Sequence, residues 1–556
     1  PNVPSLMDDE TVWSAFEKTV GTFPGRDALR VCNGEEIMET FTYSELHASA
    51  NLVAHGLAAQ GLAKGDRLGV WLPNTSEWLI LQLATAKIGV ILVNVNPAYR
   101  TMELEHALNL VGCKALVITP TLASSDYISL LNELMPEIAS SRPGQTQSQR
   151  VPSLRLVVNI GEEEHDGILN FRELLTPNPK AEERKGDTAT LAPHEAINIQ
   201  FTSGTTGAPK GATLTHHNIV NNGYLIGEAQ ILTETDSICI PVPLYHCFGM
   251  VLGNMAAITH GACLVYPADV FSPAKTLECV AANKCTALYG VPAMFNAELN
   301  LEDFDSYDLS SLRTGIMAGS PCPIDTMNRV MSQMHMKDVT IAYGMTETSP
   351  VSFQSRVDDP VEKRCETVGR IMPHTECKVV REDGSVADIG EAGELWTRGY
   401  LVMRGYWGNE KQTTDAIEDG WMKTGDVGSF DEEGYMRIGG RIKDVVIRGG
   451  ENLFPKEIED YLHSLPHVRE AEVVGVPDER YGEALCAFVV PNEKEFQNCI
   501  ADAPEAAKEE IKSALKNKIS HFKIPQHIIF YEGFDKVKTV TGKVMKKNLR
   551  EIARDK

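Results

Sequence analysis

The sequence has no long apolar segment. No apolar run among its 556 residues approaches the roughly 18 residues that a membrane-spanning helix needs. The first residues, PNVP, form neither the apolar core of a signal peptide nor an arginine-rich amphipathic helix. We therefore expect a soluble, intracellular protein without a transmembrane segment. Because the first residue is not methionine, we expect a truncated sequence. Its compartment would be the cytoplasm, or the mitochondrial matrix if a targeting segment has been removed.

Positive charge is also scarce. The chain has 52 Lys and Arg against 76 Asp and Glu, a net charge of −24. Such a charge repels nucleic acid and acidic membrane surfaces, so we predict no nucleic-acid partner. Residues 443–556 are nearly neutral, with 19 basic and 20 acidic side chains, whereas residues 1–442 have 33 and 56. This contrast, and a length beyond that of a single hydrophobic core, indicate at least two domains.

Cysteine pairs at redox or metal-binding spacing are missing. The 12 cysteines, from Cys32 to Cys499, include no Cys-x-x-Cys pair and no cysteine and histidine cluster at zinc spacing. His216 and His217 are adjacent, so their side chains diverge on a helix and do not form a metal site. We expect reduced thiols in the core. Internal repeats of solenoid length are also missing.

The first 190 residues alternate helical and strand patterns. Apolar spacing predicts helices over residues 43–57 and 77–87, and strands over 67–72, 89–95 and 113–119. This alternation favours a doubly wound α/β sheet. The polar segments 140–150 and 176–186 lack periodicity, so we expect exposed loops or linkers there.

Four later segments share one arrangement, in which a short apolar strand ends in a loop containing glycine or proline. They are residues 238–249, 287–292, 314–321 and 339–347. Ligands of open α/β sheets bind at the carboxyl ends of the strands. We therefore expect these four loops to converge on one pocket.

Residues 200–211, QFTSGTTGAPKG, form a loop rich in hydroxyl groups and glycine. Glycines allow backbone amides to turn toward an anion, the hydroxyl groups add donors, and Lys210 adds a positive charge. ATP is the expected anion, although such a run in isolation is more often a mobile surface loop. In the ordinary P-loop a serine or threonine follows the lysine, whereas Gly211 stands here, so a different nucleotide chemistry is expected.

Two segments, the loop of residues 200–211 and residues 343–348, YGMTET, together resemble the signature motifs of the adenylate-forming enzymes. These are the acyl-CoA synthetases, the adenylation domains of peptide synthetases and the beetle luciferases, and the resemblance covers nearly the whole chain. It implies that Tyr343 stacks on adenine, Thr346 bonds the α-phosphate and Glu347 holds Mg²⁺. On its own, the hexapeptide could equally be a turn with an exposed carboxylate.

Further motifs extend the resemblance. Residues 315–321, GIMAGSP, resemble the adenine pocket; Asp426 and Arg441 resemble the ribose-binding pair. His246, in YHCFG, resembles the residue at the mouth of the acyl pocket, although a packed core histidine is the alternative. Taken one at a time, Asp426 and Arg441 are more often capping or surface residues.

The last part of the chain resembles the family's small domain. Lys443 stands at the hinge position of that domain. Gly449 and Gly450 lie in the loop that resembles the one used in the CoA step, and Lys543 stands at the position of the catalytic lysine. The alternative for Lys543 is a solvated basic tail. Most relatives have proline where Val537 stands, so we expect a looser loop. Strands over 468–477 and 484–491 and a helix over 505–519 complete an α+β module.

The implied site residues form three groups. The catalytic residues are Lys543, Glu347, Thr346 and His246, of which Glu347 is also the metal ligand. The cofactor-binding residues are Thr202, Ser203, Gly204, Thr205, Thr206, Gly207, Lys210, Gly319, Ser320, Pro321, Tyr343, Gly344, Asp426, Arg441, Lys443, Gly449 and Gly450. The resemblance implies an α/β fold with a large AMP-binding domain, residues 1–442, of doubly wound sheets plus a smaller β region. A mobile α+β domain, residues 443–556, follows.

Residues 94–100, 315–323, 448–452 and 520–525 are most similar to the fatty acyl-CoA synthetases, in particular the medium-chain type called acyl-CoA synthetase family member 2. The resemblance implies activation of a fatty acid with ATP, Mg²⁺ and coenzyme A through an acyl-adenylate. Acetate-specific relatives have tryptophan where Gly344 stands, so medium to long acyl chains are expected. The alternatives are an aryl acid:CoA ligase, an adenylation enzyme that loads a carrier protein, and an idle binding protein. A homodimer is an option that the sequence leaves open.

Overall fold

The structure is a computed structural model. It describes residues 3–123, 125–177, 191–202, 209–320, 322–448, 451–478, 481–492, 500, 503–516, 519, 521–539 and 543–554. The chain forms two compact units, Pro1–Glu376 with Thr397–Met422, and Cys377–Trp396 with Lys423–Lys556. The boundary predicted after residue 442 falls inside the second unit and stays a prediction. No helix of the described residues is long and apolar enough to cross a membrane.

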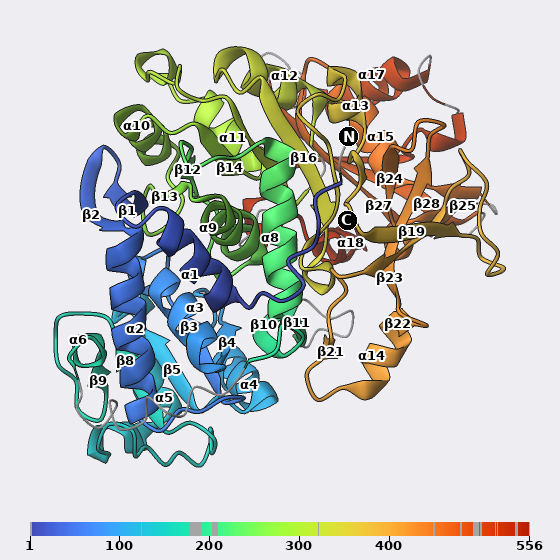
Figure 1. Cartoon of the computed structure of the whole chain (residues 1–556). Coiled ribbons are helices and arrows are strands. Elements are labelled where there is room, and N and C mark those ends of the chain that lie inside the picture. Colours follow the sequence, from blue (N-terminus) through green and yellow to red (C-terminus); the bar gives the residue numbers. More distant parts are fainter. Residues whose placement is uncertain are drawn as a thin grey trace. The chain divides into compact units, whose positions relative to one another are not determined.

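The first unit contains a large mixed sheet, sheet A, that holds the four strands of the predicted pocket (Figure 1). Strand β12 pairs with β14, β14 with β15, and β15 with β16, each time in parallel. Their carboxyl ends therefore lie along one edge, as the prediction requires, and the common pocket of the four loops stays a prediction. The order across sheet A is β18 (Arg370–Ile371), β17 (Val351–Gln354), β16 (Asp338–Gly344), β15 (Thr314–Ala318), β14 (Ala287–Gly290), β12 (Ser237–Cys239), β13 (Cys263–Tyr266), β1 (Asp27–Asn33) and β2 (Glu36–Thr42).

A second large sheet of the same unit, sheet B, carries the predicted phosphate loop between two of its strands. Strands β10 and β11 are antiparallel, and Thr202 is paired with Lys210 at the end where residues 203–208 connect them. The strands predicted near residues 67, 91 and 115 form the parallel centre of this sheet. Its order is β21 (Gly405–Tyr406), β11 (Lys210–Thr215), β10 (Ala196–Thr202), β4 (Ile91–Asn94), β3 (Arg67–Trp71), β5 (Ala115–Ile118), β8 (Leu156–Asn159) and β9 (Leu169–Asn170). A small hairpin of β6 (Thr121–Leu122) and β7 (Ser125–Asp126) stands apart.

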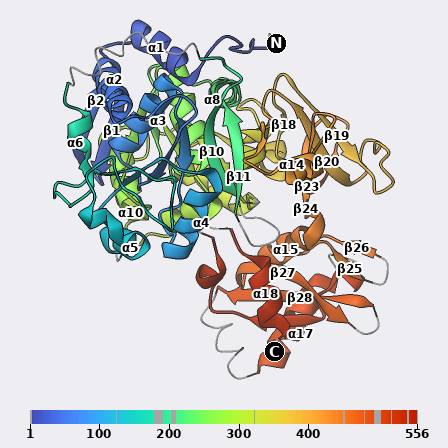
Figure 2. The same ribbon diagram turned by 90° about the horizontal axis from the view of Figure 1, so that it is seen from below.

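Helices with local start signals pack against these sheets. In α2, the Thr42 side chain accepts from the backbone N–H of Glu45, and Glu45 accepts from the N–H of Thr42. Helices α1, α2 and α3 contact one another, as Figures 1 and 2 show. The helices of this unit are α1 (Val12–Thr22), α2 (Tyr43–Ala59), α3 (Ser76–Ile88), α4 (Thr101–Val111), α5 (Tyr127–Leu134), α6 (Phe171–Leu174), α8 (His216–Gln230), the π-helix η2 (Phe248–Met255), α9 (Ala256–His260), α10 (Pro273–Asn283), α11 (Pro292–Leu299), α12 (Ile324–Gln333), α13 (Val361–Glu366) and α14 (Glu410–Ala416).

The main core of this unit joins both sheets through the helices. Leu68 of sheet B, Trp78 of α3 and Leu264 of sheet A are fully buried in one cluster. Apolar surface on both faces of parallel strands is the condition for a sheet covered by helices on each side. The predicted doubly wound arrangement is confirmed.

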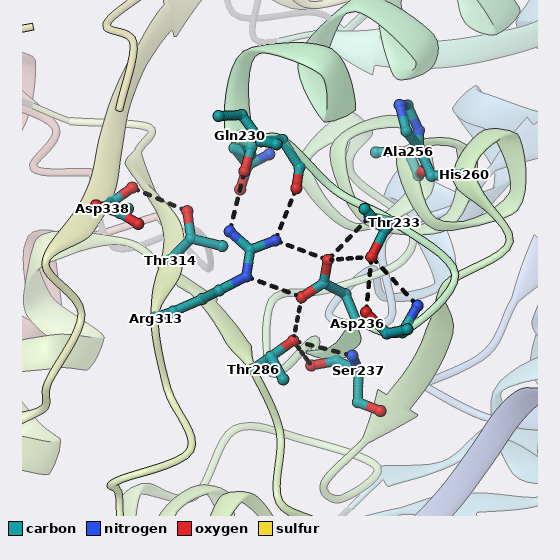
Figure 3. Close-up of polar contacts among 12 residues, drawn as sticks. Gln230, Thr233, Asp236, Ser237, Ala256, His260, Thr286, Arg313, Thr314 and Asp338 are labelled. Carbon is teal, nitrogen blue, oxygen red and sulfur yellow. Dashed lines mark hydrogen bonds and ion pairs between the residues drawn. The ribbon is translucent and has the colours of Figure 1, made fainter. Parts of the chain in front are cut away.

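Helix α8 is fixed at both its middle and its end. The Asn222 side chain donates to the carbonyl of Val351 and accepts from its N–H, both at 3.0 Å. At the end of α8, the guanidinium of Arg313 donates to the carbonyls of Gln230 and Ile231, and pairs with the buried Asp236 at 2.7 Å (Figure 3). These bonds satisfy carbonyl groups that a helix end leaves without intrahelical partners. They hold α8 against sheet A.

The second unit contains two further β layers. Most of one sheet lies in it, with the order β19 (Thr375–Val380), β20 (Gly393–Gly399), β23 (Trp421–Phe430), β22 (Ile417–Glu418), and with β24 (Met436–Arg441) beside β23. The other has the order β26 (Glu451–Leu453), β25 (Val446–Arg448), β28 (Gly482–Pro491), β27 (Val468–Asp478), with β29 (His527–Phe530) beside β28. Its helices are α15 (Pro455–His463), α17 (Pro504–Lys516) and α18 (Lys546–Arg554). The predicted strands are confirmed as β27 and β28, and the predicted helix as α17.

Candidate active site

Glu347 lies at the carboxyl edge of sheet A, in the short 3₁₀ turn Thr346–Thr348 that follows β16. The residue is only 6% exposed. Its Oε1 accepts from the hydroxyl of Tyr406 at 2.8 Å and from Thr202 Oγ1 at 3.4 Å. Among the residues that the structure describes, no basic side chain forms an ion pair with this carboxylate. A buried carboxylate held by neutral donors keeps its charge available for a cation.

Lys210 approaches the same group from β11. Its ammonium lies 4.8 Å from the ring centroid of Tyr406, a cation–π distance. Tyr406 itself belongs to β21, which pairs with β11 so that Ala212 lies opposite Tyr406. The fold thus brings Lys210 and Glu347, which are far apart in sequence, to one tyrosine side chain, and Thr202 contacts the same carboxylate.

His246 and Thr346 are joined through a buried thiol. The sulfur of Cys247 lies 3.9 Å from both His246 Nδ1 and Thr346 Oγ1. The backbone N–H of Phe248 donates to His246 Nδ1 at 3.1 Å, so the neutral ring carries its proton on Nε2. Desolvation lowers the pKa of His246 to about 4. His246 is therefore a neutral donor near pH 7 and does not offer a positive charge to a carboxylate.

The residues that are expected to contact adenine lie at the ends of β15 and β16. Tyr343 is half-buried, and its ring centroid lies 6.1 Å from that of Phe353. Gly319 has φ +88, a conformation that favours glycine, and Ser320 follows it. At Gly344 an added Cβ would lie 1.7 Å from the carbonyl oxygen of Pro350, so any side chain here requires the backbone to move.

A second group of predicted residues lies within the second unit. Asp426 of β23 and Arg441 of β24 are cross-strand partners, and Arg441 Nε lies 3.5 Å from Asp426 Oδ1. Asp426 is 9% exposed. The pair therefore presents an acceptor and a donor from adjacent strands, the combination that a ribose diol can use.

Lys543 is electrostatically coupled to this pair. Its pKa is lowered to about 8, first because the surrounding protein desolvates the ammonium, and then because Arg441 and Lys443 carry like charges. Asp426 and Asp444 act in the opposite direction. The Lys543 side chain still contacts solvent. Its backbone is tied to Thr539, whose N–H donates to the Lys543 carbonyl at 2.7 Å.

Val537 itself is held by backbone and side-chain contacts, and the looser loop expected after it stays a prediction. The N–H of Val537 donates to the carbonyl of Phe534 at 2.9 Å, a bond that proline could not make. The side chain is 5% exposed and packs in a cluster with Phe534 and Leu549. Valine therefore anchors the segment.

Several predicted residues lie outside the described part of the chain. They are Ser203, Gly204, Thr205, Thr206, Gly207, Pro321, Gly449 and Gly450.

Tyr406 and Cys247 contact predicted site residues, yet the motifs assigned neither a role. Tyr406 belongs to a strand of two residues, too short for a periodic pattern. Its one local signal is the preceding Gly405, whose φ of +144 marks an unusual backbone. Cys247 stands inside the predicted histidine motif, but its contact with Thr346 spans 99 residues.

Comparison with known proteins identifies the family. The model of the AMP-binding enzyme family matches residues 16–407, and that of the AMP-binding enzyme C-terminal domain matches residues 457–543. The chain belongs to the AMP-binding enzyme family. The predicted superfamily is thereby confirmed.

Relatives of this AMP-binding enzyme span nearly the whole chain. It is 44% identical to the medium-chain acyl-CoA ligase ACSF2, mitochondrial, of Bos taurus, over 98% of this chain and 88% of that protein. It is also 44% identical to the putative acyl-CoA synthetase YngI of Bacillus subtilis (strain 168), over 97% of this chain and 96% of that protein. Among solved structures, ATP-bound MatB from Rhodopseudomonas palustris aligns with a TM-score of 0.82 at 27% identity, covering 97% of this chain and 99% of that one.

Proposed function

We propose that this AMP-binding enzyme is an AMP-forming fatty acid:CoA ligase that activates medium- to long-chain fatty acids through an acyl-adenylate. The observation that carries the proposal is that Thr202 and Tyr406 both donate to Glu347, just after β16, while Lys210 lies over the Tyr406 ring. Hydroxyl, ammonium and carboxylate groups so placed suit the phosphates of ATP and a divalent cation. The relatives named as acyl-CoA ligases support the choice of acid and of coenzyme A.

In the proposed first half-reaction, a carboxylate oxygen of the fatty acid attacks the α-phosphorus of ATP, and pyrophosphate leaves. Thr346 would bond the α-phosphate, and Lys210 and Lys543 would offset the negative charges that the two substrates bring together. In the second, the thiol of coenzyme A attacks the acyl carbon, and AMP leaves with the former carboxylate oxygen. No protein nucleophile is needed, so positioning and charge neutralisation carry the catalysis.

The metal proposed for this reaction is Mg²⁺, which would neutralise charge on the phosphates when bound. The buried Glu347 carboxylate fits it, because a hard cation prefers oxygen ligands and the described residues supply no competing cation within ion-pair distance. Tyr343, Gly319 and Ser320 would contact adenine, while Asp426 and Arg441 would hold the ribose. His246, neutral and with its proton on Nε2, would position the acyl carboxylate.

A compartment inside the cell is also proposed. Every cysteine in the described part of the chain is a free thiol, and most are buried. Persistent free thiols are typical of reducing compartments. The cytoplasm and the mitochondrial matrix both fit, and the word mitochondrial in the name of the Bos taurus relative supports the matrix.

The test is a panel of acids with ATP, Mg²⁺ and coenzyme A, scored for AMP, pyrophosphate and thioester. Octanoate, decanoate and palmitate should give all three products, and acetate and benzoate little. Benzoate as the best substrate would favour an aryl acid ligase. Pyrophosphate release without thioester would favour carrier loading, and no acid-dependent pyrophosphate release would favour an idle binding protein.

A further inference from the structure

Tyr406 contacts two residues of the proposed ATP site, Glu347 and Lys210. Its hydroxyl donates to Glu347 Oε1 at 2.8 Å, and its ring lies 4.8 Å beneath the Lys210 ammonium. Thr202 donates to the same Oε1 at 3.4 Å, a longer and weaker bond. No role in the proposed chemistry has yet been given to this tyrosine.

The backbone around Tyr406 is held on both sides. Its N–H donates to Thr413 Oγ1 at 2.9 Å, and the N–H of Trp407 donates to the carbonyl of Gly211 at 2.8 Å. Gly405 lies so close to Thr413 that an added Cβ would be 2.7 Å from its methyl group. The phenol is therefore placed before any ligand binds, as a positioning group requires.

The hydroxyl of Tyr406 is the donor in its contact with Glu347. A carboxylate offers only acceptors, so the O–H of Tyr406 donates to Oε1 at 2.8 Å and holds this oxygen in one direction. Within the described residues no hydrogen bond reaches Oε2. One carboxylate oxygen is thus fixed, and the other remains for a cation.

The ring has a separate effect on Lys210. An ammonium and a carboxylate in one buried site attract each other strongly, and a direct ion pair would cancel both charges. No ion pair between Lys210 and Glu347 occurs among the described contacts. Tyr406 contacts Lys210 through its ring and Glu347 through its hydroxyl. The ammonium is held on the ring face by a cation–π contact and stays available for an anion.

We infer that Tyr406 is a positioning residue of the ATP site, which orients the Glu347 carboxylate toward the metal ion and keeps Lys210 from pairing with it. The inference rests on the proposed function, because it takes Glu347 as a metal ligand. It assigns the tyrosine no contact with substrate. Groups that orient a ligand from outside the coordination shell typically change metal affinity by about 10- to 100-fold when removed.

The test measures metal binding without turnover. Mn²⁺ serves as a paramagnetic probe for Mg²⁺, and an ATP analogue with a methylene group between the α- and β-phosphates blocks adenylation. Electron paramagnetic resonance then gives the affinity for Mn²⁺ in the protein–nucleotide complex. Tyr406→Phe, which keeps the ring and loses the hydroxyl, should weaken Mn²⁺ binding about tenfold. Binding of the metal-free nucleotide should stay within about twofold of wild type.

One further variant separates the ring of Tyr406 from its hydroxyl, and another serves as the control. Tyr406→Leu removes the ring beneath Lys210 and should weaken Mn²⁺ binding more than Tyr406→Phe. The control is Tyr266→Phe, which loses a buried hydroxyl that donates to Asn254 Oδ1 at 2.7 Å, away from this group. It should bind Mn²⁺ like wild type. Circular dichroism checks that each variant is folded.

The outcomes distinguish the inference from the function on which it rests. If wild type binds Mn²⁺ with the nucleotide and a folded Tyr406→Phe binds it equally well, the inference is overturned and the proposed function stands. If wild type shows no nucleotide-dependent Mn²⁺ binding at all, the proposed function and the inference both fail.

Discussion

At the scale of single residues, the charge of Lys543 matters most for the proposed chemistry. Its pKa of about 8 lies well below the ordinary value for lysine because of desolvation and the neighbouring Arg441 and Lys443. An ammonium so placed gains from binding two anions, since they supply the negative charge that its surroundings lack. The residue is therefore suited to the adenylation step, in which carboxylate and phosphates meet.

Lys543→Ala should abolish adenylation while leaving the second half-reaction intact. Acid-dependent exchange of labelled pyrophosphate into ATP should fall by at least about a thousandfold, because charge neutralisation in a transition state contributes several kcal/mol. Synthetic decanoyl-adenylate should still give decanoyl-CoA. Equal losses in both assays would contradict the assignment.

The rate of adenylation should also depend on pH through Lys543. The ammonium is the active form, so pyrophosphate exchange should fall as the pH rises through about 8, the pKa of this lysine. Asp444→Asn removes a negative charge that stabilises the ammonium, so the inflection should move to lower pH. A pH–rate profile of both proteins tests this. An unchanged inflection in Asp444→Asn would exclude Lys543 as the titrating group.

At the scale of elements, α18 connects Lys543, the proposed catalytic lysine, with the turn Ile442–Asp444. The helix begins three residues after Lys543. Lys546 pairs with the buried Glu459, and Arg550 pairs with Asp444 at 2.8 Å and donates to the carbonyl of Lys443 at 3.3 Å. The turn itself has no buried residue. Arg550 is therefore an important support for its position.

Arg550→Gln should slow adenylation roughly fivefold, equivalent to about 1 kcal/mol, a typical value for one lost hydrogen bond. The matched control is Arg554→Gln, which removes the same charge from an exposed position on the same helix. Pyrophosphate exchange should distinguish the two. Equal rates for the two variants would mean that α18 does not position the turn.

The end of α8 depends on an ion pair between the buried Asp236 and the partly exposed Arg313. Burial raises the pKa of Asp236, but the bonds from Arg313 and Thr286 outweigh it and lower the pKa. Asp236→Asn should lower the free energy of unfolding by about 2 kcal/mol, because hydrogen bonds to a charged group are lost. The exposed pair of Lys284 and Asp308 gives the control, Asp308→Asn, with a small effect expected.

The direction of the Asp236 pKa shift determines how this stabilisation depends on pH. The folded pKa of Asp236 lies below the unfolded value of about 3.9. The stabilisation is therefore complete above pH of about 4 and is lost as the pH falls through the folded pKa. Denaturant unfolding of wild type and Asp236→Asn at pH 7 and pH 3 measures it. If the difference in the free energy of unfolding between the two proteins is the same at pH 7 and pH 3, the account is contradicted.

At the scale of the whole molecule, local patterns predicted the strands and helices well. The strand ends of sheet A converge because parallel strands present their carboxyl ends at one edge, a property that short apolar segments reveal. Two domains were predicted, but not that residues 377–396 belong to the second unit, because 26 residues of the first unit separate them from the rest of it. Tyr406 was missed for the same reason, since its bond to Glu347 spans 59 residues.

The predicted movement of the small domain can be tested at Lys443. Proline fixes φ near −65° and is tolerated in the first turn of a short helix, where Lys443 lies in Ile442–Asp444. Lys443→Pro should therefore leave this turn intact and keep pyrophosphate exchange within about twofold of wild type. Thioester formation from decanoyl-adenylate should fall by about a hundredfold or more, because the second conformation is hindered. Wild-type thioester formation would show that no rotation at this residue is needed.

The central claim, that a carboxylate attacks the α-phosphorus of ATP, is tested most directly with decanoate labelled with ¹⁸O in both carboxylate oxygens. Attack at that phosphorus followed by thiolysis leaves one carboxylate oxygen on the phosphate of AMP. Mass spectrometry of the nucleotide should therefore find one ¹⁸O in each AMP formed, and none in pyrophosphate. Label in pyrophosphate or inorganic phosphate, or ADP in place of AMP, would contradict the mechanism.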